Sequence, residues 1–230
     1  MLLAAGLAAV AGTAAAAAHG AFHRNSPVFG RVMSRLPGKD RAVALTFDDG
    51  PNPEATPRIL DVLRESRVSA TFFLLGKHVE RWPRLARRIA DEGHTIGNHG
   101  YHHGKLHLRG PAYTRMDLCV GTEVIVRTTG QTPRHLRTPH GFRSPWVNAI
   151  ARELGQRAVG WTLGVWDTDR PGAAAIAERV RRGVRPGSIV LLHDGDACDP
   201  EGDRAQTADA LTQVIRDLRD SGYRLALLPS

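Results

Sequence analysis

Two histidines and two aspartates stand at spacings that suit metal-assisted hydrolysis. The stretch NHGYHH places His99 and His103 four residues apart, so both imidazoles can reach one ion from a single helical turn or a tight loop. The stretch TFDDGP places Asp48 and Asp49 directly after an apolar run. Two neutral imidazoles and one carboxylate leave coordination positions open, an arrangement typical of a catalytic metal site.

Neighbouring carboxylates repel each other, so this pair needs a physical reason. A divalent cation provides one: one carboxylate binds the ion, and the other accepts a proton from the water whose pKa the ion lowers. The residues alone leave open which of Asp48 and Asp49 has which role. A simple turn is the competing explanation, because D-D-G-P is rich in turn formers. His102, three residues from His99, is an alternative ligand.

The elements that must position these side chains alternate from residue 41 onward. Short apolar segments typical of buried parallel strands occur at 42–47, 69–75, 94–98, 134–138, 157–162, 188–192 and 223–228. Helical patterns lie near 55–66, 79–92, 112–128, 146–155, 172–183 and 205–221. Repeated βα units predict an α/β fold in a single domain, either a barrel of about seven strands or a doubly wound sheet.

Ionisable residues follow five of these predicted strands at the point where each strand ends. They are Asp48 and Asp49, His99 and His103, Arg137, Asp167, and His193. Because the carboxyl ends of parallel barrel strands meet at one rim, we expect these side chains to form a single site.

The same stretches resemble a known family. TFDDGP (46–51), NHGYHH (98–103), RTPHG (137–141), WTLGVWD (161–167) and LLH (191–193) occur in the order of the five motifs of polysaccharide deacetylases, the NodB-homology, family 4 carbohydrate esterases. The resemblance covers residues 41 to about 228. It implies a distorted (β/α) barrel and metal-dependent removal of N-acetyl, or sometimes O-acetyl, groups from sugars.

The resemblance also implies roles for the matched residues. The general base is Asp48, and the metal ligands are Asp49, His99 and His103. Arg137 resembles the arginine that holds the base carboxylate, and His193 the general acid that protonates the leaving amine. Asp167 matches the acid that orients that histidine, although Asp169 and Asp194 lie close in the sequence. Asp194 is disfavoured as the partner of His193, because it is the next residue along the strand and adjacent side chains of a strand point to opposite faces.

Four further residues are expected to contact the substrate. Pro139, His140 and Gly141 are expected to line the site, with a backbone N–H group near them and the metal stabilising the oxyanion. Leu191 forms one wall of the acetyl pocket.

Three positions depart from the family pattern. Gly100 stands where serine or threonine usually ties the loop of the first metal histidine, and Tyr101 is the residue that we expect to compensate. Thr168 replaces a common tryptophan, and His140 replaces a frequent aromatic residue. These changes affect the walls and not the acid, base and metal groups, so they bear on substrate more than on reaction.

Composition limits the other possibilities. The chain has 230 residues, 42% of them hydrophobic and 23% charged, which suits one soluble domain. Its formal net charge is +8, but acids are interspersed among the arginines and no basic–aromatic block occurs, so we expect no nucleic-acid partner. This positive charge is also compatible with weak attraction to an acidic polymer of the cell envelope. Cys119 and Cys198 are too few for a disulfide framework, and whether they pair stays open.

The N-terminal 18 residues are apolar and rich in alanine. They lack a basic n-region but offer A-x-A cleavage sites before His19, so we expect a secretory signal peptide, with a membrane anchor as the alternative. Residues 19–40 then form a linker or lead-in, and residues 41–230 the catalytic domain.

We therefore expect an extracytoplasmic, metal-dependent hydrolase that removes N-acetyl groups from an amino-sugar glycan. Zinc is the expected ion, with cobalt, nickel and manganese as alternatives. We expect a monomer, with peripheral or anchored association with a membrane as an option. Two other functions stay open: a deformylase or deacylase of a lipid-linked amino sugar, and a non-catalytic glycan-binding relative. Asp48 and His193 argue against the second, since binding alone needs neither base nor acid.

Overall fold

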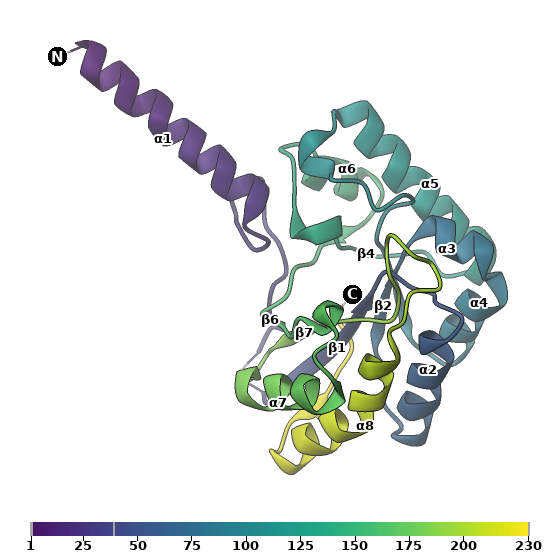
Figure 1. Ribbon diagram of the computed structural model, residues 1–230. Helices are drawn as coiled ribbons and strands as arrows, with labels where there is room; N and C mark the ends of the chain where they lie inside the picture. Colours follow the sequence, from purple (N-terminus) through teal and green to yellow (C-terminus); the bar gives the residue numbers. More distant parts are fainter. Residues whose placement is uncertain (1, 39, 230) are drawn as a thin grey trace.

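The computed structural model describes residues 2–38 and 40–229, with side chains from residue 10 onward. One sheet of eight parallel strands curls toward a barrel, and helices pack around its outer side (Figure 1). The strand order is β5-β4-β3-β2-β1-β7-β6, with β8 beside the first residues of β1. The strands are β1 (Ala42–Asp48), β2 (Thr71–Leu74), β3 (Thr95–Asn98), β4 (His135–Leu136), β5 (Arg157–Ala158), β6 (Leu163–Gly164), β7 (Ile189–His193) and β8 (Arg224–Leu225). The predicted single-domain α/β barrel is confirmed.

Helices follow most of the strands, as predicted. They are α2 (Ala55–Glu65), α3 (Gly76–Arg81), α4 (Pro83–Asp91), α5 (Pro111–Thr129), α6 (Val147–Glu153), α7 (Ala173–Gly183) and α8 (Ala205–Asp220). Short 3₁₀ turns occur at η1 (Leu106–Leu108), η2 (Pro139–Gly141) and η3 (Asp167–Asp169). The predicted helix 79–92 is two helices, because Pro83 has no amide hydrogen to continue one helix and suits the first turn of the next.

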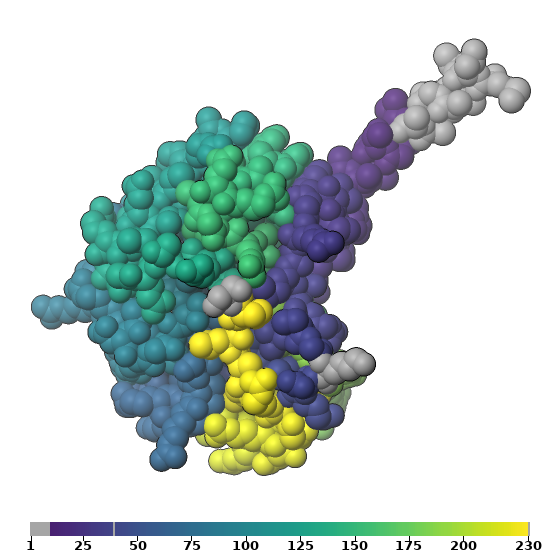
Figure 2. Space-filling view, turned by 180° about the vertical axis from the view of Figure 1, so that it is seen from behind, coloured from purple at the N-terminus to yellow at the C-terminus, as the bar shows by residue number. Residues whose placement is uncertain are grey.

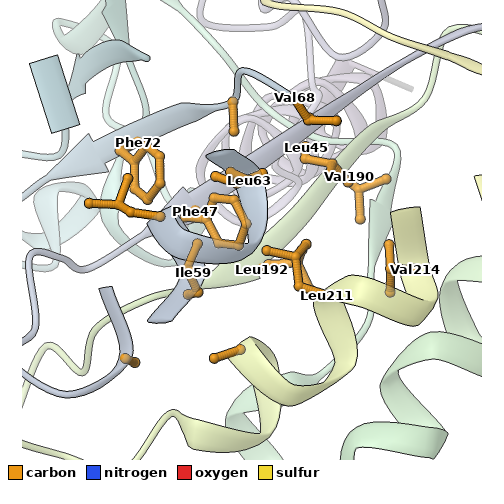
Figure 3. Close-up of a cluster of buried hydrophobic side chains, with 14 of the residues drawn as sticks. Leu45, Phe47, Ile59, Leu63, Val68, Phe72, Val190, Leu192, Leu211 and Val214 are labelled. Carbon is orange, nitrogen blue, oxygen red and sulfur yellow. The ribbon is translucent and has the colours of Figure 1, made fainter. Parts of the chain in front are cut away.

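Successive side chains of a strand point to opposite faces, and β1 uses its two faces differently. Its odd positions face the helices and join the main hydrophobic core, between the sheet and helices α2 and α8 (Figure 3). Labelled members of this core are Leu45, Phe47, Ile59, Leu63, Val68, Phe72, Val190, Leu192, Leu211 and Val214. Ala44 belongs to a separate cluster inside the barrel. Thr46 and Asp48 share its parity, so β1 ends with a carboxylate on the inner face.

The predicted strand 157–162 is wrong as one continuous element. Only its first two residues form a strand, β5, which pairs with β4 at one edge of the sheet. Strand β6 begins just beyond the predicted range, at Leu163, and pairs with β7 at the other edge. The chain crosses between the two edges through Gly160 and Trp161. The passage is tight, since a Cβ atom at Gly160 would lie 2.2 Å from Asn25 Oδ1. Any larger residue there would displace the Asn25 side chain, which packs against this crossing.

Residues 19–36 of the predicted lead-in (19–40), called the lead-in segment below, pack along this crossing. Met33 forms a parallel bridge with Val159, and Leu36 is buried in the cluster inside the barrel. From behind, the purple lead-in lies against the green part of the chain and beside the yellow C-terminal segment (Figure 2). Although it precedes the predicted catalytic domain, the lead-in segment is part of the barrel's packing.

Helix α1 (Leu2–Phe22) projects away from the barrel (Figure 1). Among the described residues, no helix combines the length and the apolar character that crossing a bilayer requires. The signal peptide predicted for residues 1–18 stays a prediction, and its first residue lies outside the described residues. Cys119 and Cys198 are both free thiols.

Candidate active site

Asp48 ends β1 on the inner face of the barrel, where its carboxylate meets a buried arginine. Arg137 follows β4, and its Nη1 donates to Asp48 Oδ1 over 2.7 Å and to Thr46 Oγ1 over 2.9 Å. Its Nη2 donates to the Gly160 carbonyl over 3.0 Å, and its guanidinium lies 4.1 Å from the centroid of the Phe73 ring. An ionised partner and an aromatic face compensate for burying this charge. The Asp48 carboxylate is thereby fixed in one orientation.

Asp49 directs its carboxylate into the same space although it is the next residue. Its φ of +72° lies in the left-handed region, which aspartate tolerates better than most residues. This backbone turn ends the alternation of the strand. His99 Nε2 lies 3.3 Å from Asp49 Oδ1, and His103 Nε2 lies 3.2 Å from the same atom. The three residues predicted to ligate a metal therefore come together.

These three side chains fit a tetrahedral cation. Two ligand atoms that lie about 2.0–2.1 Å from such an ion are about 3.3 Å apart, which matches the distance from each imidazole nitrogen to Asp49 Oδ1. That oxygen is buried and makes no hydrogen bond to a described residue, a costly state for a carboxylate without a cation. His99 Nδ1 lies 2.7 Å from the Arg137 carbonyl oxygen, which can only accept. Its Nε2 is therefore left with the lone pair that a metal needs.

The surroundings of Asp49 favour its ionised form. Without a bound cation, burial would raise the pKa of the carboxyl, but hydrogen bonds and positive charge from protonated His103 and His99 hold it well below its usual value. The neutral imidazoles described above belong to the metal-bound state, in which the cation supplies the positive charge. His78 of α3 supports the same residue, since its Nδ1 lies 2.7 Å from the Asp49 carbonyl oxygen and donates to it. Desolvation lowers the pKa of His78, as expected for a neutral imidazole donor.

His193 ends β7 opposite Asp48 in the sheet register. Its Nδ1 donates to Asp167 Oδ1 over 2.8 Å, and its backbone N–H donates to Asp167 Oδ2 over 2.7 Å. Thr207 Oγ1 donates to Asp167 Oδ2 over 2.9 Å. Burial alone would lower the pKa of His193, but the charge and hydrogen bond of Asp167, with Asp49 and Asp48 nearby, raise it to about 9. The imidazole is therefore protonated at neutral pH.

The two alternative acids lie elsewhere. Asp194 Oδ2 accepts a hydrogen bond from Thr56 Oγ1 over 2.6 Å, and burial raises its pKa to about 7. Asp169 is exposed at the end of η3. The sequence preference for Asp167 as the partner of His193 therefore agrees with the contacts.

The loop that carries the two histidines of the cluster is held by Asp117 of α5. Its carboxylate accepts hydrogen bonds from the backbone N–H groups of Tyr101 and His102, each over 3.1 Å. His102 Nδ1 also lies 2.8 Å from Asp117 Oδ1, so this ring is engaged outside the metal cluster. Gly100 has a φ of +81°, and a Cβ atom there would lie 2.5 Å from Asp117 Oδ2. A carboxylate from α5 thus takes the place of the usual serine or threonine.

Tyr101 does not compensate for Gly100 with its hydroxyl, contrary to expectation. That hydroxyl donates to Glu80 over 2.7 Å, on the surface. Only the backbone N–H of Tyr101 helps to hold the loop. The carboxylate of Asp117 is the tie, and it belongs to a helix that the sequence pattern does not connect with the site.

One cavity of about 890 Å³ is lined by six of the predicted site residues: Asp48, Asp49, His99, His103, Asp167 and His193. Arg137 is buried behind Asp48 and is not among the described residues of the lining. Three of the expected substrate contacts, His140, Gly141 and Leu191, line it. Pro139 is buried in η2 and is not among the described residues of the lining, so its role is limited to shaping the turn. The His140 ring lies 4.6 Å from that of His103, centroid to centroid.

The wall beyond His193 includes Thr168 and Trp166. Thr168 lines the cavity where the family commonly has tryptophan. Trp166, two residues earlier, also lines the cavity, with 70% of its surface exposed and a left-handed φ of +53°. Although Thr168 is small, this wall therefore still carries a large aromatic side chain.

Sequence reasoning missed the contributions of His78, Asp117 and the lead-in segment. His78 and Asp117 act through the backbone of other residues, and nothing in their own helical patterns signals this. The lead-in segment contributes Phe22, His23 and Arg24 to the cavity lining, although its low-complexity neighbourhood suggested a linker.

Comparisons with known proteins agree with this site. Residues 35–159 match the family model described as polysaccharide deacetylase. The chain belongs to the polysaccharide deacetylase family. A chitooligosaccharide deacetylase from Bradyrhizobium sp. (strain ANU 289) is 40% identical over 196 residues, covering 82% of this chain and 90% of the relative. The chain is therefore, as expected, a hydrolase of this family that acts on carbon–nitrogen bonds other than peptide bonds.

Solved structures of this polysaccharide deacetylase family have the same fold. A peptidoglycan N-acetylglucosamine deacetylase, solved with 4-naphthalen-1-yl-N-oxidanyl-benzamide, has a TM-score of 0.80 and 35% identity, covering 86% of this chain and 91% of that chain. A family 4 carbohydrate esterase pseudoenzyme from Bacillus anthracis has a TM-score of 0.77 and 30% identity, covering 84% and 66%. Since the family includes a pseudoenzyme, the fold alone does not imply activity, and an activity must be argued from the groups at the site.

Proposed function

We propose that this polysaccharide deacetylase uses a divalent metal ion to remove N-acetyl groups from N-acetylglucosamine residues of an extracytoplasmic glycan. The observation that carries the proposal is the convergence of three units on one cavity. These are the cluster of Asp49, His99 and His103, the pair of Asp48 with Arg137, and the pair of His193 with Asp167. An amide hydrolysis needs all three, because its carbonyl must be polarised, its water deprotonated and its amine leaving group protonated.

Asp49, His99 and His103 hold the ion, which polarises the acetyl carbonyl and acidifies water when it is bound. Asp48 accepts the proton of the attacking water. Arg137 binds one oxygen of the Asp48 carboxylate, Oδ1, which leaves the other oxygen free to act. Zinc is the proposed ion, and cobalt, nickel and manganese suit the same donor set.

His193 donates a proton to the departing amine from Nε2, since its Nδ1 is engaged by Asp167. The turn at η2 is proposed to stabilise the oxyanion through one backbone N–H group. Gly141 and Phe142 already donate to carbonyl oxygens of Thr138 and Pro139. Proline has no N–H, which leaves the His140 amide as the donor of this turn.

The proposed substrate class follows the names of the relatives, which act on chitooligosaccharides or on peptidoglycan N-acetylglucosamine. We also propose export, with residues 1–18 as a signal peptide. The Ala21 carbonyl accepts a hydrogen bond from the Arg143 N–H over 3.0 Å, so cleavage between residues 18 and 21 leaves this contact in the mature protein. The intact mass of exported protein should correspond to a start between His19 and Ala21.

The test is acetate release from N-acetylchitooligosaccharides and from peptidoglycan, with formate release and O-acetylated glycan measured alongside. Chelator-treated protein should be inactive, and Zn²⁺ or Co²⁺ should restore the rate. The Asp48→Asn variant is the matched control, because it should keep the metal and lose turnover. Metal-loaded wild-type protein that releases neither acetate nor formate from any of these glycans would refute the proposal.

A further inference from the structure

Three consecutive residues of the lead-in segment line the cavity that holds the catalytic groups. They are Phe22, His23 and Arg24. All three precede residue 35, where the match to the polysaccharide deacetylase family begins. This wall is therefore built by a part of the chain that the family match does not cover.

The wall is held in place by several specific contacts. Asn25 Nδ2 donates to the Trp161 carbonyl over 2.9 Å, and Arg24 Nε donates to the same oxygen over 3.3 Å. The Arg24 guanidinium also lies 5.2 Å from the centroid of the Trp161 ring. Buried Arg143 donates through its side chain to the Ser26 carbonyl. On the N-terminal side, the Ala21 carbonyl accepts a hydrogen bond from the Arg143 backbone N–H over 3.0 Å. The segment is thus anchored to the barrel on both sides of the cavity-lining residues.

Close packing extends from this wall to the turn proposed to bind the oxyanion. A Cβ atom at Gly141 would lie 2.8 Å from Arg24 Cβ and 2.8 Å from Trp161 Cη2. Gly141 has a φ of +72°, so no other residue suits this position easily. The lead-in segment therefore sets the shape of the cavity where it meets η2.

Phe22 gives the wall its chemical character. It is 57% exposed, and its ring lies edge-on to those of Phe142 and His107, 5.5 and 5.1 Å away between centroids. Phe142 in turn lies 5.6 Å from the ring of His140, which lies 4.6 Å from that of His103. A line of aromatic rings thus leads from the metal cluster to Phe22.

This arrangement favours a sugar ring as the ligand of Phe22. The C–H groups on the apolar face of a pyranose carry partial positive charge and suit the electron-rich face of an aromatic ring. A cavity of about 890 Å³ also lies near the upper end of the usual range for small-ligand sites, roughly 300–1,000 Å³, so it has room for more than one sugar ring.

We propose that Phe22, positioned by the rest of the lead-in segment, binds a sugar ring of the glycan other than the ring that carries the reacting acetyl group. Phe22 is separated from His103 by two intervening rings, so the ring that it contacts lies away from the reaction. The lead-in segment is therefore a determinant of substrate length. The identity of the ligand as an N-acetylglucosamine oligomer rests on the proposed function.

The experiment compares wild-type protein with Phe22→Ala and with Val28→Ala. Val28 is 47% exposed on the same segment but does not line the cavity, so it is the matched control. Binding of N-acetylchitooligosaccharides with two to six rings is measured by calorimetry in the presence of a chelator, and acetate release is measured with Zn²⁺. Phe22→Tyr should behave as wild type, and melting temperatures identify any variant that has lost its fold.

Phe22→Ala should weaken binding of the five- and six-ring oligomers by about three- to tenfold and raise KM equally, with kcat unchanged. Binding of the two-ring oligomer should not change. Equal affinities of wild type and Phe22→Ala for the longest oligomers, or an equal loss in Val28→Ala, would overturn the proposal. If wild-type protein binds the oligomers in a Phe22-dependent manner but releases no acetate, the proposed function is refuted. The proposal that Phe22 binds a sugar ring would still be supported.

Discussion

The strand ends and the cavity walls of this enzyme are built by different means. Asp48 and His193 are placed by the parity and register of two paired strands, so their positions follow from the sheet itself. The walls come from short turns, which carry His140 and Trp166, and from the C-terminal end of helix α1, which carries Phe22. The sheet therefore fixes which reaction is possible, whereas the walls decide which glycan reaches it. Substitutions at the strand ends should change turnover or metal content, and substitutions in the walls should change KM.

The two neighbouring carboxylates at the end of β1 should show the largest effects. Asp48→Asn keeps size and shape but cannot accept the proton, so kcat should fall by about two to four powers of ten with metal content unchanged. Asp49→Asn removes an anionic ligand, so metal should be lost at modest chelator concentration and activity should partly return with excess ion. Metal stoichiometry and rates measured side by side test both. If Asp48→Asn loses the ion and Asp49→Asn keeps it, their roles are exchanged.

The next largest effect is expected in the loop after β3, where His103, a proposed metal ligand, is compared with its neighbour His102. His103→Ala removes one of the three cluster groups, so metal affinity and activity should both be lost. His102→Ala removes a half-exposed ring that pairs with Asp117, so it should retain metal and most activity. Dialysis against a metal buffer, with the bound ion quantified, measures both. The ligand assignment is wrong if His102→Ala is the damaging change.

The pair of His193 and Asp167 predicts a pH effect whose sign can be derived. The pKa of His193 is raised to about 9, so its acid form is present at neutral pH and is lost as the pH rises through that value. Asp167→Asn removes the stabilising charge, so the alkaline limb of kcat should move to lower pH by about one to three units. Rate profiles from pH 6 to 10 test this. An unmoved alkaline limb would mean that His193 is not the titrating acid.

The sequence predicted the rim of this site well, because its chemical groups sit on the chain directly after apolar strands. Asp48, His99 and His193 could be located in this way before any contact was known. The positions of β5 and β6 could not. Residues 157–162 read as one strand, whereas β5 ends at Ala158 and β6 begins only at Leu163, on the opposite edge of the sheet.

The residues missed by the sequence have a common physical feature. Asp117 binds backbone N–H groups of a loop, and His78 binds a backbone carbonyl. Such contacts depend on the position of another element and leave no spacing pattern in the sequence. The lead-in segment was missed for a related reason: its contacts with Trp161 and Arg143 are formed across more than 100 residues of chain.

The smallest expected effect lies in the wall that contains Trp166, which lines the same cavity as the lead-in segment. Trp166 is held by Arg179, whose Nη1 donates to the Val165 carbonyl over 2.8 Å and to the Trp166 carbonyl over 3.3 Å. Its ring makes no contribution to the acid, base or metal groups. Trp166→Ala should therefore raise KM for N-acetylchitohexaose by about three- to tenfold and leave kcat unchanged.

Met116→Ala is the control for this prediction, because Met116 is an exposed apolar residue of α5 outside the cavity lining. Steady-state kinetics on both variants separate KM from kcat. A fall in kcat at constant KM for Trp166→Ala would mean that the wall helps to place His193. Trp166 directly precedes Asp167, the first residue of η3, and Asp167 binds His193. Such a result would therefore mean that this cavity wall and the catalytic strand ends do not act independently.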